Sequence, residues 1–156
     1  MRWIYYFCSV ILIDTHTHLY LNAFDEDREA MVERAIASGV KYMFLPNIDS
    51  GSINGMHALC DKFPENCFPL MGLHPTSVKE NFREELANVE RLLGEETSYG
   101  IGETGIDLYW DKTFYPEQVE AFNKQIDLAI DYGLPLVIHA RESFKEIFEV
   151  LEGRDI

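Results

Sequence analysis

Two histidines separated by one residue, His16 and His18, follow an apolar run that ends at Asp14. If residues 10–14 form a β-strand, side chains alternate between its faces, and Asp14, His16 and His18 point towards a common side where the chain leaves the strand. Two imidazoles that converge in this way indicate metal binding. An isolated pair of this kind is more often part of a polar turn, so the metal hypothesis depends on further ligands at equivalent positions.

Ligands of this type stand at the ends of two later apolar runs. Glu103 ends the run over 99–103, and His139 ends the run over 134–139. A single histidine after an apolar run is more often a core residue, but four ligand-type residues from three runs favour one shared site. Histidine and carboxylate suit zinc, manganese or iron, and the two oxygens of Glu103 can bridge two ions. Two such ions stabilise the attacking and leaving oxygens in phosphoester hydrolysis.

Two more polar residues stand at the ends of apolar runs. His74 follows the run over 67–73, and Arg141 comes two positions after His139. The planar guanidinium of Arg141 suits a phosphate oxygen of a substrate. A salt bridge to Glu142 or a helix-capping role explains Arg141 equally well from its spacing alone.

The apolar runs alternate with amphipathic segments about every thirty residues, which predicts repeated βα units and a parallel sheet. The carboxyl ends of all its strands then lie on one rim, where barrel enzymes carry their catalytic residues. The runs are continuous, as in strands covered on both faces. The expected strands are 10–14, 40–46, 67–73, 99–103 and 134–139, and the expected helices are 25–38, 50–63, 81–93, 117–132 and 142–151.

Composition narrows the class of protein. The 156 residues are 47% apolar, which is sufficient for the core of one domain. Thirteen Lys and Arg face 27 Asp and Glu, a net charge of −14, so no basic nucleic-acid-binding surface is expected. Binding of a phosphate substrate would therefore depend on divalent cations, which reverse the local sign of the charge.

The remaining features concern location. The three cysteines show no C-x-x-C spacing, which indicates reduced thiols and a cytoplasmic protein. No apolar run approaches the roughly 20 residues that a membrane span needs, so no membrane association is expected. Residues 1–9 are interpreted as an N-terminal extension, and residues 10–156 as the folded domain.

Four segments resemble successive motifs of the TatD family of metal-dependent hydrolases, in the family's order and spacing. They are residues 13–19, 72–75, 102–107 and 138–141. The resemblance covers about residues 11–152. It implies a (β/α)₈ TIM barrel of the metallo-dependent hydrolase type, and deoxyribonuclease activity or related phosphodiester hydrolysis with two divalent ions, Zn, Mn or Mg.

The resemblance also implies roles for single residues. His16 and His18 correspond to ligands of one metal, His139 to a ligand of the second, and Glu103 to the carboxylate shared by both. Glu103 and, at the substrate, Arg141 are the expected catalytic residues.

The substrate side of the site follows in the same way. His74 and Arg141 correspond to substrate-binding positions, with DNA as the expected substrate and no obligate protein partner. Asp107 either closes the turn after the fourth strand or takes part in binding.

The chain departs from the family in length. An eight-stranded barrel typically needs about 250 residues, and the sequence offers five βα units, without the family's histidine at the sixth strand and aspartate near the eighth. We therefore expect a barrel truncated after about five units, a fragment that is at best weakly active alone and whose unpaired strand edges drive oligomerisation. Two alternatives remain open: a hydrolase of small amides, esters or lactones, which the acidic charge favours, and a non-catalytic half-barrel.

Overall fold

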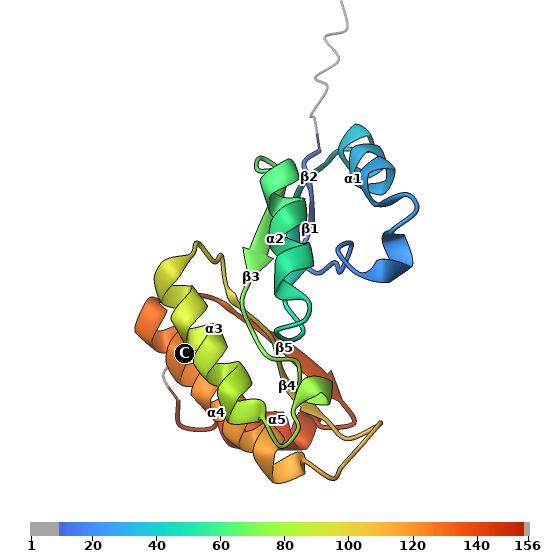
Figure 1. Ribbon diagram of the computed structural model, residues 1–156. Coiled ribbons are helices and arrows are strands. Elements are labelled where there is room, and N and C mark those ends of the chain that lie inside the picture. The colour runs from blue at the N-terminus through green and yellow to red at the C-terminus, as the bar shows by residue number, and fades with distance from the viewer. Residues whose placement is uncertain (1–9, 155–156) are drawn as a thin grey trace, which may run out of the picture.

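The computed structural model describes residues 10–154, in which five strands alternate with five α-helices (Figure 1). The interpretation of residues 1–9 as an extension lies outside the described residues. The strands are β1 (Leu12–Asp14), β2 (Val40–Pro46), β3 (Cys67–Leu70), β4 (Ile101–Asp107) and β5 (Leu136–Arg141). The α-helices are α1 (Arg28–Ala37), α2 (Ile53–Lys62), α3 (Phe82–Glu95), α4 (Tyr115–Tyr132) and α5 (Phe144–Leu151). Two short 3₁₀ helices, η1 (Asn22–Phe24) and η2 (Pro75–Ser77), lie between them.

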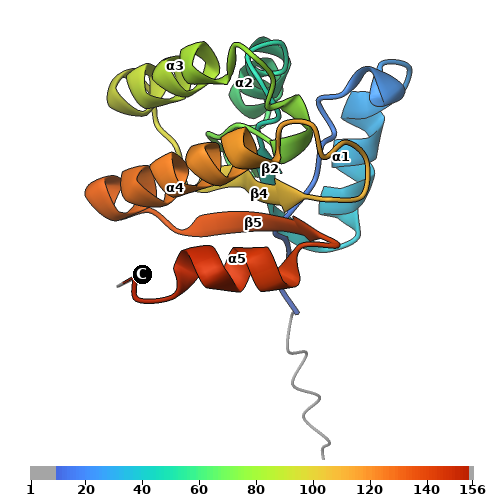
Figure 2. The ribbon, with the colours of Figure 1, turned by 90° about the horizontal axis from the view of Figure 1, so that it is seen from below.

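All pairs of described strands are parallel and follow the order of the sequence. β1, β2 and β3 form one ladder, and β4 and β5 form a second. A parallel bridge between Met71 and Ile101 joins the two ladders. The prediction of sequential βα units is therefore confirmed, and Figure 2 shows β5 lying between α4 and α5.

The carboxyl ends of three strands differ from the prediction. β3 ends at Leu70, three residues before the expected Leu73. β4 continues to Asp107 and β5 to Arg141, so Glu103 and His139 lie within strands and not at their ends. β4 can continue past Glu103 because residue 105 is a glycine. Its φ is +139°, and a Cβ at this position would stand 2.1 Å from the carbonyl oxygen of His139. A glycine-rich segment that suggests a turn in the sequence therefore continues as a paired strand.

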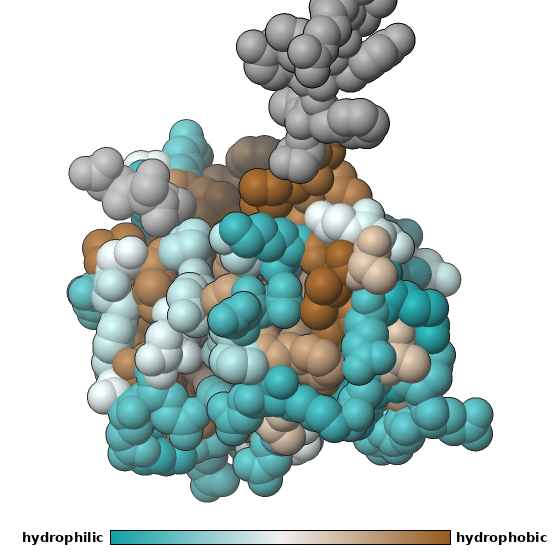
Figure 3. Space-filling model, turned by 90° about the horizontal axis from the view of Figure 1, so that it is seen from above, coloured by the Kyte–Doolittle hydropathy of each residue, from teal (hydrophilic) through white to brown (hydrophobic). Residues whose placement is uncertain are grey.

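The strands also differ in how well they are covered. Every residue of β4 is buried, as a continuous apolar run predicts. Leu12 and Ile13 of β1 are instead 46% and 52% exposed, because within residues 10–154 this strand pairs only with β2. Figure 3 shows an apolar (brown) surface near the top of the view, next to the upper group of grey atoms.

Helix α4 positions the site with two buried glutamines, Gln118 and Gln125. The Gln125 side chain accepts a hydrogen bond from the Leu73 amide at 2.7 Å and donates one to the Leu73 carbonyl at 3.2 Å. Gln118 accepts from the amide of Asp107 at 2.8 Å. Two side chains seven residues apart, on one face of the helix, thus fix the backbone beside His74 and at Asp107.

None of the helices in residues 10–154 is both long enough and apolar enough to cross a membrane.

Replacing Gln125 by leucine should destabilise the protein, because the amide and the carbonyl of Leu73 lose their buried partner. The expected loss is about 2–4 kcal/mol of unfolding free energy, since each unsatisfied buried backbone group costs about 1–3 kcal/mol. Chemical denaturation measures it. Asp131→Leu, on the exposed side of the same helix, is the control, and a Gln125→Leu protein as stable as this control would contradict the role given to Gln125.

Candidate active site

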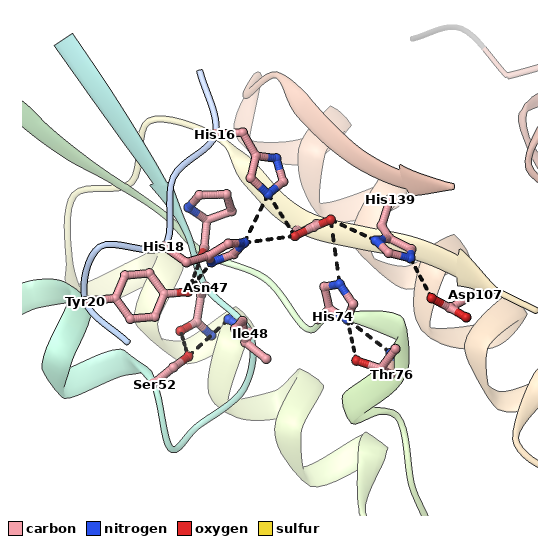
Figure 4. Close-up of polar contacts among 12 residues, drawn as sticks. His16, His18, Tyr20, Asn47, Ile48, Ser52, His74, Thr76, Asp107 and His139 are labelled. Carbon is pink, nitrogen blue, oxygen red and sulfur yellow. Dashed lines mark hydrogen bonds and ion pairs between the residues drawn. The ribbon is translucent and has the colours of Figure 1, made fainter. Parts of the chain in front are cut away.

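Four histidines surround the carboxylate of Glu103, which is only 6% exposed (Figure 4). Its Oε2 atom lies 3.0 Å from Nε2 of His16 and 3.2 Å from Nε2 of His18. Its Oε1 atom lies 2.9 Å from Nδ1 of His139 and 3.6 Å from Nε2 of His74. The structure therefore brings together the four residues predicted as metal ligands and adds His74 to them, with two imidazoles at each carboxylate oxygen.

Asn47, directly after β2, holds the backbone at the centre of this cluster. Its amide donates to the carbonyls of Leu70 and Gly102, and its carbonyl accepts from the amide of Glu103 at 3.1 Å. The Asn47 side chain is fully buried and donates to the carbonyl of Gly72 at 2.8 Å. One residue therefore ties the ends of β2 and β3 to the middle of β4, and so places Glu103 opposite the histidines.

Tyr20 orients the ring of His18. Its hydroxyl donates to the Pro46 carbonyl and lies 2.8 Å from Nδ1 of His18. Because the Pro46 carbonyl can only accept, the hydroxyl proton points to it, and the Tyr20 oxygen accepts the proton of His18 Nδ1. Nε2 of His18 then carries a lone pair that faces Glu103 and His16, as a metal ligand requires.

Asp107 orients His139 in the same way. Its Oδ2 atom lies 2.8 Å from Nε2 of His139, so the Nε2 proton is donated to Asp107 and the Nδ1 atom faces Glu103. Its Oδ1 atom accepts from the amides of Tyr109 and Trp110 at 2.9 and 3.1 Å. Asp107 thus closes the turn after β4 and also contacts His139, while its part in binding stays a prediction.

The ring of His74 differs from those of His18 and His139, because it directs a proton and not a lone pair towards Glu103. Its Nδ1 atom accepts from the backbone amide of Thr76 at 3.1 Å, and the Thr76 hydroxyl lies 2.7 Å away. A backbone amide can only donate, so in a neutral His74 the ring proton sits on Nε2 and points into the cluster. His74 is therefore arranged as a hydrogen-bond donor, which suits a substrate oxygen better than a metal ion.

These contacts determine the ionisation states of Glu103 and His139. Burial opposes ionisation of Glu103, but hydrogen bonds from His139 and His74 outweigh it and hold the pKa of Glu103 well below its usual range. Burial likewise disfavours the charged form of His139, yet its bonds to Glu103 and Asp107 raise the pKa of His139 above 6.5. The cluster thus keeps Glu103 ionised, and without a metal it favours a protonated His139.

The donor set fits divalent cations. His16, His18 and Glu103 form one group of ligand atoms, and His74, Glu103 and His139 form another, with the atoms of each group within 4.8 Å of one another. Nε2 of His16 and Nε2 of His18 are 3.0 Å apart, and ligand atoms of a tetrahedral ion at about 2.0–2.1 Å stand about 3.3 Å apart. Lone pairs so close repel one another unless a proton or a cation lies between them.

Arg141 lies apart from this cluster. It is the last residue of β5, is exposed, and places its guanidinium 3.9 Å from the ring centre of Tyr109 and 5.1 Å from that of Trp110. Among residues 10–154 it forms no salt bridge to Glu142, and Ser143 is the N-cap residue of α5. Neither structural alternative for Arg141 is therefore observed among residues 10–154, and its predicted catalytic and substrate-binding role stays a prediction.

Parallel βα units that present histidines and a buried carboxylate on one rim define a barrel hydrolase of the metal-dependent class. Residues 13–155 match the model of the TatD related DNase family, and the chain belongs to that family.

Individual relatives agree with this assignment. The uncharacterized metal-dependent hydrolase YabD of Bacillus subtilis is 32% identical over 142 residues, which are 91% of this chain and 55% of YabD. A protein of Erwinia tasmaniensis named 3′–5′ ssDNA/RNA exonuclease TatD is 28% identical over 141 residues, covering 90% of this chain and 54% of that protein. The chain thus spans about half the length of the curated relatives it matches.

The fold is confirmed by a solved structure. The crystal structure of YjjV, a TatD homologue from Escherichia coli K12, matches with a TM-score of 0.82 at 26% identity, over 90% of this chain and 55% of that one. The predicted TIM-barrel architecture of the metallo-dependent hydrolase type is therefore correct for the part of the barrel that the chain covers.

Sequence reasoning missed three residues that orient the site, namely Tyr20, Gln118 and Gln125. The two glutamines carry a detectable signal, because they interrupt the apolar face of a strongly patterned helix. Tyr20 carries none, since a tyrosine near the end of a strand is common and its hydrogen bonds are visible only in three dimensions.

Replacing Tyr20 by phenylalanine should weaken metal binding, because His18 loses the acceptor that fixes its ring and tautomer. A lost partner of a metal-binding histidine typically costs about 10–100-fold in affinity. Calorimetric titration with Mn²⁺ measures the change. Tyr132→Phe, which removes a distant hydroxyl on α4, is the control, and equal affinity in the two variants would rule out the orienting role of Tyr20.

The metal-free protein should lose stability as the pH rises from 6 to 9. The pKa of His139 is higher in the folded protein than its ordinary value of 6.5, so its contribution is complete below pH 6.5 and disappears as the pH passes the folded-state pKa. Added Mn²⁺ should reverse the trend, because protons compete with the metal for the ring. Thermal unfolding across this range measures both slopes.

The control for this pH dependence is His139→Gln, which should flatten the metal-free slope. A metal-free wild-type protein that instead gains stability over this range, relative to the variant, would contradict the assigned charge of His139.

Proposed function

We propose that this chain carries one half of a two-metal phosphodiesterase site that hydrolyses single-stranded DNA. The observation that carries the proposal is that each of the two oxygens of the Glu103 carboxylate faces its own pair of imidazoles. The printed name of the Erwinia relative, an exonuclease of single-stranded DNA and RNA, supports a nucleic-acid substrate.

His16, His18 and Oε2 of Glu103 would hold one ion, and His139 with Oε1 of Glu103 would hold the other. When bound, two divalent ions supply positive charge at the phosphate and lower the pKa of water to near neutrality. The net charge of the chain is −14, so a phosphodiester could approach this rim only where that charge is locally reversed.

The protein's own groups do three things at this site. Tyr20 and Asp107 keep the ring nitrogens of His18 and His139 in the state that binds a cation. His74 points its Nε2 proton inwards, where it can donate to a phosphate oxygen and fix the substrate beside Glu103. The depressed pKa of Glu103 keeps the carboxylate ionised at any physiological pH.

Glu103→Gln should abolish the proposed activity, because an amide supplies one neutral oxygen where two charged ones are needed. We expect a loss of at least about 1,000-fold in Mn²⁺-dependent release of nucleotides from a single-stranded DNA oligomer, comparable to the removal of a main electrostatic group. Since the chain spans about half of YabD, the assay is run on the chain and on a chimera continued by the uncovered half of YabD.

The control is Glu142→Gln, an exposed carboxylate just after β5, which should leave the rate unchanged. If the active chimera cleaves a small amide, ester or lactone and leaves DNA intact, the nuclease proposal is wrong and the small-molecule alternative takes its place. Equal rates in wild type and Glu103→Gln would overturn both.

A further inference from the structure

Two large aromatic side chains face solvent directly after β4. Tyr109 is 49% exposed and Trp110 is 68% exposed, and their rings meet edge to face with centres 4.9 Å apart. The guanidinium of Arg141 covers the Tyr109 ring at 3.9 Å. Tyr109, Trp110 and Arg141 are called the aromatic platform below.

The aromatic platform is fixed to the candidate metal cluster through one carboxylate. Oδ1 of Asp107 accepts the amides of Tyr109 and Trp110, while Oδ2 contacts Nε2 of His139. Asp107 is 1% exposed and is itself held by Gln118, so this connection is buried and well determined. Asp107 therefore fixes the backbone of Tyr109 and Trp110 relative to His139.

A small cavity of about 100 Å³ is lined by both Trp110 and Asp107. Its lining includes Pro75 and Thr76, which follow His74, and Lys79 and Phe114. Trp110 and the two residues that follow His74 therefore share one indentation of the surface.

If the substrate is a nucleic acid, the acidic charge of the chain favours one with unpaired bases over a duplex. With 27 acidic residues against 13 basic ones, the chain cannot rely on a broad basic surface to hold a polyanion. Stacking on aromatic side chains is independent of that charge, and it is typically worth about 5- to 150-fold in affinity per base. A guanidinium on an aromatic ring adds a second stacking surface and one positive charge.

We propose that the aromatic platform is a stacking site for an unpaired nucleobase of single-stranded DNA, next to the nucleotide whose phosphate is cleaved. This rests on the proposed function and specifies its substrate as a strand with exposed bases. It also assigns a role to Arg141 away from Glu103: the guanidinium binds the neighbouring nucleotide, and does not contact the phosphate that reacts.

The test is binding without cleavage, measured by tryptophan fluorescence. In a Trp3→Phe background Trp110 is the single tryptophan of the chain. Three probes are titrated with Ca²⁺ present, so that the charge of the rim is reversed, and gel analysis confirms that the strands stay intact: a ten-nucleotide oligothymidylate, the same backbone with abasic sites, and a DNA duplex. The duplex, whose bases are paired, should bind no better than the abasic strand. We expect the oligothymidylate to quench Trp110 and to bind about 5- to 150-fold more tightly than the abasic strand.

Two variants separate stacking from other effects, with binding followed by anisotropy of a labelled strand. Trp110→Leu should reduce the preference for bases over abasic sites to near unity, and Trp110→Phe should largely restore it. Phe148→Leu, an aromatic residue on α5 that is 67% exposed, is the matched control and should keep the full preference. An undiminished preference in Trp110→Leu, or equal binding of intact and abasic strands by wild type, would overturn the proposal.

The outcome is distinguishable from failure of the proposed function. If Glu103→Gln retains the base preference and the active chimera cleaves no DNA, the stacking site stands and the nuclease proposal fails. If DNA cleavage depends on Glu103 while Trp110→Leu leaves the KM for single-stranded DNA unchanged, the stacking proposal alone is wrong.

Discussion

The ionised carboxylate of Glu103, buried among four imidazoles, is the interaction on which the rest of the structure depends. A charge removed from water is costly unless it is paired and hydrogen-bonded on all sides. Here the partners come from three different βα units: His16 and His18 after β1, His74 after β3 and His139 in β5. Hydrogen bonds from His139 and His74 stabilise the carboxylate in the metal-free protein, and the surrounding imidazoles place their ring nitrogens in the two groups of potential ligand atoms.

Bringing these units together requires backbones that approach more closely than side chains allow. A Cβ at Gly72 would lie 2.7 Å from the carbonyl carbon of Gly102, and one at Gly105 would lie 2.1 Å from the carbonyl oxygen of His139. Where these backbones approach closely, Asn47 forms hydrogen bonds to both Gly72 and Gly102. A side chain at Gly105 would therefore separate β4 from β5, and one at Gly72 would separate the segment leading to His74 from β4, without removing a single ligand.

Much of this arrangement can be predicted from the sequence, because hydrophobic periodicity reports strands and helices and parallel strands place their ends on one rim. The convergence of His16, His18, Glu103 and His139 follows from that rule. Local backbone conformation cannot be predicted in this way. The sequence places the end of β4 too early, because Gly105 permits strand pairing where a turn is expected. The surroundings of Arg141 are also invisible in the sequence, since its aromatic neighbours come from another strand. Histidine tautomers need the partner atoms themselves, and these separate His74, as a donor, from His18 and His139.

Anomalous X-ray diffraction from crystals of the protein grown with Mn²⁺ tests the central claim most directly. The account predicts two manganese peaks on opposite sides of the Glu103 carboxylate. One should lie within bonding distance of Nε2 of both His16 and His18, and the other within bonding distance of Nδ1 of His139, with Nε2 of His74 bound to neither. Manganese absent from both Glu103 oxygens, or a peak ligated by Nε2 of His74, would contradict it.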